Sequence, residues 1–214
     1  MTATVTLILL GVLLGIRHAV DPDHVVAIGT IATRSRSIRQ SATLGVLWGV
    51  GHTLTVMVVG GAIVLSRMAL SPRVALAMEF GVAIMLIILG LLNLAGARRA
   101  DPPAFSCARP LVVGMVHGMA GSAAIALLVL ATIRDAALGL VYLLCFGAGT
   151  IAGMAGVTAL VVLPLTMAAA RAGASRRWLA TASGLASLAF GAALVYALGG
   201  PAALFATVPA FVSR

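Results

Sequence analysis

Six apolar segments, each long enough to cross a lipid bilayer, take up most of the 214 residues of the chain. A helix needs about 20 consecutive apolar residues to span the hydrocarbon core of a membrane. A composition that is 62% hydrophobic and 9% charged leaves no material for a sizeable soluble domain. We therefore predict an all-α polytopic membrane protein in which residues 1–214 form a single transmembrane domain. The six segments lie at residues 4–30, 41–66, 75–96, 110–131, 137–168 and 179–200.

The arginines indicate how these segments are oriented, because short loops rich in arginine stay on the cytoplasmic side. The first, third and fifth loops together carry nine arginines, whereas the second carries two and the fourth carries one. We expect the odd-numbered loops inside and both termini outside, in the plasma (inner) membrane. The net charge of +9 is spread over the loops, so it does not indicate nucleic-acid binding.

The first segment contains a dense polar cluster that reads Arg-His-Ala-Val-Asp-Pro-Asp-His from Arg17 to His24. Polar groups are costly to bury in hydrocarbon unless they are paired, hydrated or bound to a ligand. A helix end whose charged residues meet water at the membrane surface is the simplest explanation. However, such ends rarely combine two histidines with two aspartates, so the cluster indicates a binding site.

Pro22 predicts that the first helix is broken within this cluster. Inside a helix, Pro22 lacks an N–H and clashes with the carbonyl of His18, which loses its helical donor. On an unbroken helix, His18 and Asp21 share one face and the aspartate and histidine that follow point elsewhere. A break would let the four side chains converge. Imidazole nitrogens together with carboxylate oxygens suit a divalent first-row metal such as Ni, Co or Zn.

All four histidines of the chain lie inside predicted spans, and no predicted loop carries one. His52 stands beside Thr53 in the second span, and His117 is in the fourth. A hydrogen bond within the core explains any single intramembrane histidine, but packing does not explain all four. We therefore predict one metal site. Its candidate ligands are His18, Asp21, Asp23, His24, His52 and His117.

Four further polar or structural residues are expected to support this site. Arg17 is expected to pair with Asp21, which would leave Asp23 as the direct ligand, although the sequence leaves open which aspartate contacts the metal. Glu79, near the outer end of the third span, either guards the route to the site or faces the lipid headgroups. The supporting residues are Arg17, Pro22, Thr53 and Glu79.

Two short matches indicate an internal repeat. Gly15–Ala19 resembles Gly114–Gly118 at an offset of 99, and Leu47–His52 resembles Cys145–Thr150 at an offset of 98. Three spans separate the copies, and an odd number places the halves in opposite orientations. We expect a 3+3 inverted repeat with a broken first helix and a substrate site between the halves, as in many secondary transporters. The halves would be roughly residues 1–100 and 101–214.

The polar cluster resembles the signature of the nickel/cobalt transporter family, a His-x4-Asp-His pattern in an early transmembrane helix that His18, Asp23 and His24 match. Gly51-His52-Thr53 resembles the family's second motif, and residues 114–122 and 146–154 look like its short branch, which is often found with urease genes. The resemblance implies transport of Ni²⁺ or Co²⁺, with these three residues and His52 at functional positions. Larger members have a later acidic motif that is absent here, so the preferred metal stays open.

We predict a secondary carrier of Ni²⁺ and/or Co²⁺, in which the ion is the transported substrate and no permanent cofactor is needed. Uptake is favoured over efflux because no loop has the histidine-rich sequence of many exporters. The chain has no phosphate-binding loop of the Gly-x4-Gly-Lys-Ser/Thr type, so it cannot hydrolyse ATP by itself. Its partners are the metal ion and the lipid bilayer; an energising partner and the oligomeric state stay open.

The main alternative is an intramembrane enzyme, either metal-dependent or a lipid enzyme that uses His18 and Asp23 as a dyad. No separate catalytic domain accompanies that dyad here, so we do not expect an enzyme. A carrier of another substrate, such as an organic anion or an amino acid, is a third interpretation. Four intramembrane histidines with two acids favour a cation.

Overall fold

The computed structural model describes residues 2–32, 37–66, 71–97, 107–119, 124–171 and 176–200, and within these ranges every regular element is an α-helix. This confirms the predicted all-α class. Four helices (α3, α4, α7 and α8) are long and apolar enough to cross a membrane, and the bent pair of α1 and α2 would make a fifth span. The helices are α1 (Thr2–His18), α2 (Pro22–Ala32), α3 (Ile38–Ser66), α4 (Pro72–Ala97), α5 (Ala108–His117), α6 (Ala124–Thr132), α7 (Ala136–Arg171) and α8 (Arg176–Ala197).

The fourth predicted span, residues 110–131, differs most from its expected form. It consists of two short helices, α5 and α6, with residues 120–123 between them outside the described part of the chain. Neither helix alone has the length of a transmembrane span. The sixth crossing therefore stays a prediction. The other five predicted spans correspond to the bent pair α1 and α2 and to the long helices α3, α4, α7 and α8.

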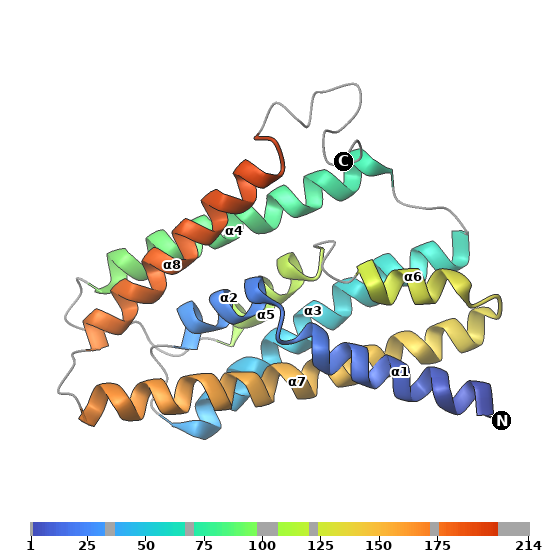
Figure 1. Ribbon diagram of the computed structural model, residues 1–214, viewed down its shortest axis with the longest axis horizontal. Helices are drawn as coiled ribbons and strands as arrows, with labels where there is room; N and C mark the ends of the chain where they lie inside the picture. The colour runs from blue at the N-terminus through green and yellow to red at the C-terminus, as the bar shows by residue number, and fades with distance from the viewer. Residues whose placement is uncertain are drawn as a thin grey trace.

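The break between α1 and α2 positions the polar cluster. The two helix axes differ by 57°, and Pro22 is the first residue of α2, where a missing N–H costs nothing. The sequence predicts that the His18 carbonyl loses its helical donor, but it accepts a bond from the Asp21 N–H at 3.1 Å. The break therefore brings the end of α1 and the start of α2 together at the centre of the molecule (Figure 1).

Two long helices, α3 and α7, form the centre of the fold and run antiparallel. Gly45 lies against Met154, and Gly60 against Leu143, further along α3 and earlier on α7. Each long helix also carries a short one. The helix α1 packs along α7, and α5 packs along α3. Figure 1 shows α1 running from the N-terminus at one end of the molecule to its middle, where the short helix α5 lies.

These short helices approach the long ones at glycines. A Cβ atom on Gly15 of α1 would overlap the carbonyl oxygen of Phe146 on α7. In the same way, a Cβ atom on Gly114 of α5 would overlap the carbonyl oxygen of Trp48 on α3. Small residues let helix backbones approach this closely inside a membrane. The glycines therefore fix how deeply α1 and α5 seat against their partners.

The helices α4 and α8 form a second antiparallel pair, which Figure 1 shows along the upper side of the molecule beyond α2. Gly90 and Gly184 meet where the two helices cross. Asn93 Nδ2 on α4 donates to the Ala180 carbonyl at 3.1 Å and to Ser183 Oγ at 2.8 Å. These contacts join α4 to α8. None of the four histidines belongs to either of these helices.

Candidate metal-transport site

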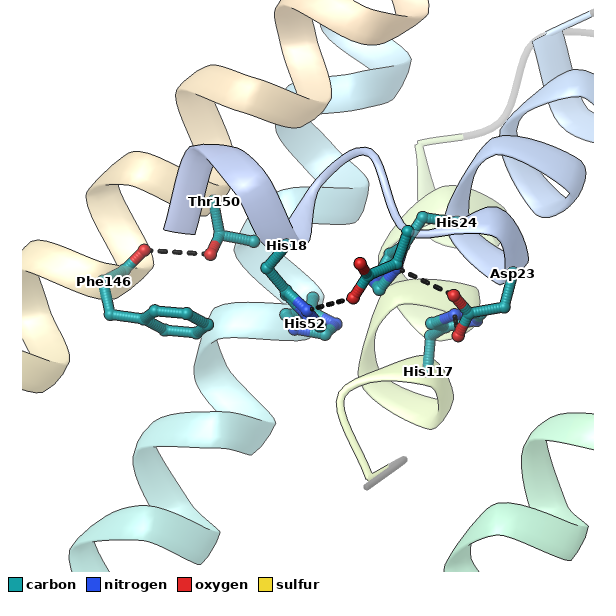
Figure 2. A network of polar contacts seen from close by, with 8 residues as sticks. His18, Asp23, His24, His52, His117, Phe146 and Thr150 are labelled. Atoms are coloured by element: carbon teal, nitrogen blue, oxygen red, sulfur yellow. Dashed lines mark hydrogen bonds and ion pairs between the residues drawn. The ribbon is translucent and has the colours of Figure 1, made fainter. Parts of the chain in front are cut away.

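The four histidines meet at one buried place between α1, α2, α3 and α5 (Figure 2). His18 is the last residue of α1, and His117 is the last residue of α5. The exposed fraction is 5% for His18 and 0% for His24, His52 and His117. The break between α1 and α2 therefore achieves the predicted convergence, since it turns His24 toward the end of α1.

Three imidazoles form a first group, the three-histidine group (His18, His24 and His52). One possible ligand atom from each lies within 4.8 Å of the other two. His18 Nε2 and His52 Nε2 are 3.0 Å apart. The ring centroids of His18 and His24 are 4.5 Å apart and stand edge to face. All three residues come from the first half of the chain.

A carboxylate and two imidazoles form a second group, the aspartate group (Asp23, His24 and His117). Its ligand atoms also lie within 4.8 Å of one another. His117 Nε2 donates to Asp23 Oδ2 at 2.9 Å, and Asp23 Oδ1 lies 3.3 Å from His24 Nδ1. His24 belongs to both groups, so the two groups share one imidazole.

The second carboxylate, Asp21, touches the site through His18. His18 Nδ1 donates to Asp21 Oδ2 at 2.8 Å, because a carboxylate only accepts. This bond fixes the ring and leaves Nε2 of His18 directed at His52, the usual role of a carboxylate behind a ligand histidine. Asp21 therefore belongs to neither group of possible ligands. The predicted pairing of Arg17 with Asp21 is wrong, since Asp21 pairs with His18 and Arg17 is exposed.

The arrangement suits a divalent transition metal better than a purely structural network. His24 Nε2 and the Nδ1 atoms of His52 and His117 are buried without a hydrogen-bond partner, and His24 Nδ1 makes no hydrogen bond although it lies 3.3 Å from Asp23 Oδ1. Buried polar atoms normally have one, so this many orphans in one cluster need an explanation. Nitrogen and carboxylate oxygen donors are those preferred by Ni, Co and Zn.

Comparison with known proteins identifies the family. The family model NicO, described as a high-affinity nickel-transport protein, matches residues 4–99. The urease accessory protein UreH of Bacillus sp. (strain TB-90) is 34% identical over 217 residues, which cover 94% of this chain and 95% of UreH. The chain belongs to the NicO family. No solved structure matches it.

Membership of the NicO family confirms the resemblance that the motifs indicate, and it makes the chain a membrane transporter of nickel and not an enzyme. The geometry of the site also argues against a lipid enzyme. A dyad of His18 and Asp23 would require these two side chains to pair. Instead His18 pairs with Asp21, and Asp23 pairs with His117.

The supporting residues predicted for this NicO protein lie outside both groups of ligands. Thr53 Oγ1 donates to the Gly147 carbonyl at 3.3 Å, so it joins α3 to α7. Pro22 forms the start of α2. Glu79 is half-buried on α4 and has an electrostatic interaction with Asp23. Arg17 is exposed at the end of α1.

Two aromatic rings pack against the histidines of the site, and the sequence predicted no role for either. The Phe146 ring lies 5.5 Å from the His18 ring, between centroids. The Trp48 ring lies 5.5 Å from both His24 and His117. Trp48 and Phe146 are themselves equivalent positions of the predicted repeat, at an offset of 98. That match could have identified them as paired walls of one site.

Proposed function

We propose that this chain is a secondary carrier that takes up Ni²⁺, and Co²⁺ through the same ligands, across the plasma (inner) membrane. The observation that supports the proposal most is the burial of all four histidines of the chain in one cluster with two aspartates. Desolvating these groups is costly unless a ligand compensates. A cation bound by the imidazoles and by Asp23 supplies that compensation.

The charges of the site fit one divalent ion. Asp23 offers a direct carboxylate ligand, and Asp21 places a second negative charge behind His18. Two carboxylates balance the double positive charge of Ni²⁺ or Co²⁺ inside a region of low dielectric. The same balance disfavours an organic anion.

Burial of the ligands favours a carrier over a channel. A channel needs a continuous row of ion-binding sites that water can reach, whereas these imidazoles are 0–5% exposed. Access to such a site requires a change of conformation that opens one side at a time. The proposed outward position of both termini rests on the arginine distribution. The proposed direction of transport rests on the absence of histidines from the predicted loops.

We further propose that the chain is one domain built of two inverted halves, residues 1–100 and 101–214. The helices pair in the order that such a repeat requires: α1 packs on α7 as α5 packs on α3. The glycine contacts repeat too, since Gly51 lies against Leu111 and Gly149 against Val12. The antiparallel pairs α3 with α7 and α4 with α8 support opposite orientations of the halves.

Metal accumulation in expressing cells tests the proposed function. Cellular Ni, Co and Zn would be quantified for the wild type and for a His18→Ala/His24→Ala double variant. We expect the wild type to raise Ni or Co, and the variant to match cells without the protein. A fall in cellular metal content with the wild type would show export in place of uptake. No change with any metal, in a well-expressed protein, would refute the proposed carrier function.

Asp135→Asn provides a matched control. Asp135 is exposed and its Oδ1 accepts from the Leu138 N–H at 3.0 Å, at the start of α7. Asparagine caps a helix as well as aspartate does, so this variant removes one carboxylate without touching the site. Its uptake should equal that of the wild type.

A further inference from the structure

We propose that the transported ion occupies two overlapping positions in succession, the three-histidine group and the aspartate group, and that His24 stays bound while the other ligands are exchanged. The proposal rests on the proposed function. It assigns the five ligands to two sets of three that share one member, in place of a single five-ligand site.

The first argument is distance. Two ligand atoms on the same ion can be at most about 4.2 Å apart, because metal–nitrogen bonds are about 2.1 Å long. Among the residues that the structure describes, the groups that approach this limit are the two sets of three, each within 4.8 Å. The His52 and His117 rings have centroids 6.4 Å apart, and these two residues share no group. His24 lies between them, with centroids 5.2 Å from His52 and 4.4 Å from His117.

The second argument is charge. Two carboxylates serve the whole cluster, Asp23 in one group and Asp21 behind the other. One divalent ion is neutralised by them, whereas two ions sharing His24 would exceed these two charges by two, and by one even if the half-buried Glu79 is counted. The two positions are therefore alternatives for one ion and not a binuclear centre.

The third argument is the arrangement of the helices. His18 ends α1 and His117 ends α5, and these helices run in opposite directions, because α1 lies parallel to α7 and α5 lies parallel to α3. Each terminal histidine packs against an aromatic ring from the other half, Phe146 beside His18 and Trp48 edge to face with His117. Movement of α1 would open the three-histidine group, and movement of α5 would open the aspartate group. An ion that enters through one group can leave through the other.

Imidazole counting on the purified full-length protein tests this arrangement. Wild type, His52→Gln and His117→Gln would be loaded with Ni²⁺ in nanodiscs, and X-ray absorption would count the imidazoles bound to nickel. In His52→Gln we expect the ion in the aspartate group, with two imidazoles; in His117→Gln we expect it in the three-histidine group, with three. Each variant should hold one ion per chain, while uptake into proteoliposomes falls at least about tenfold.

A single five-ligand site makes different predictions. It would show four imidazoles in the wild type and three in His52→Gln, and either result overturns the two positions. Wild-type transport by either variant also overturns them. Failure of the wild-type protein to bind nickel would refute the proposed function itself. If His52→Gln does not fold, Asp23→Asn replaces it: three imidazoles support two positions, and four contradict them.

Discussion

Replacing Asp21 tests whether this carboxylate acts through His18 or binds the metal itself. Its Oδ2 atom accepts from His18 Nδ1 at 2.8 Å, and it belongs to neither group of possible ligands. Asp21→Asn keeps an acceptor oxygen at this place and removes the charge. We therefore expect weaker metal binding, although no direct ligand is removed.

The magnitude follows from the bond that is weakened. A hydrogen bond to a charged group contributes about 1.5–3 kcal/mol, and about 1.4 kcal/mol corresponds to a tenfold change in affinity. The Asp21 side chain is 33% exposed, so water screens part of its charge. Asparagine also retains part of the bond. We expect about a tenfold loss of Ni²⁺ affinity for Asp21→Asn, and between about tenfold and a hundredfold for Asp21→Ala.

Isothermal titration of the purified protein with Ni²⁺ would measure these losses, with Asp23→Asn beside them. Asp23→Asn removes the one carboxylate among the possible ligands, so it should cost more than Asp21→Asn. In Asp21→Asn only the three-histidine group is weakened, so X-ray absorption should show no more imidazoles bound to nickel than in the wild type. The reasoning would be refuted by unchanged affinity in Asp21→Asn, or by a loss as large as that of Asp23→Asn.

Three further predictions follow from the same structure. Nickel affinity should fall as the solution is made more acidic, because protons and metal compete for the same nitrogens; titrations across the neutral to acidic range would check this, and a flat profile would contradict it. Gly15→Ala should lower the melting temperature and uptake, because its Cβ overlaps the Phe146 carbonyl, whereas Gly156→Ala, whose Cβ meets nothing within 4 Å, should not. Tyr142→Phe should leave stability unchanged or raise it, because the buried Tyr142 hydroxyl has no hydrogen-bond partner; a melting temperature several degrees lower would show that the hydroxyl is used.

The sequence was sufficient for the features that depend on composition and on residue type. Apolar length predicts the helices α3, α4, α7 and α8, since a membrane span imposes the same length wherever it occurs. Burial is costly for every polar side chain, so four intramembrane histidines already imply a shared site. Pro22 likewise predicts the break between α1 and α2, because the missing N–H is a local property.

The sequence was insufficient wherever pairing depends on three-dimensional approach. Arg17 was an equally plausible partner for Asp21 along the chain, but the turn after α1 directs His18 to it instead. The division of the ligands into two groups depends on where α5 ends, and His117 is 94 residues from its partner Asp23. No local pattern encodes such a contact.

The packing of α1 on α7 has a consequence for how the chain is made. The surface that receives α1 begins near Tyr142, more than a hundred residues after α1 ends at His18. At a synthesis rate of about 5–20 residues per second, α1 emerges on the order of ten seconds before its partner. During that interval His18 lacks Phe146, and His24 lacks His117, the second-half residues that later pack against them. Until the second half is inserted, these polar side chains therefore need a polar environment, either in the insertion machinery or at the lipid headgroups.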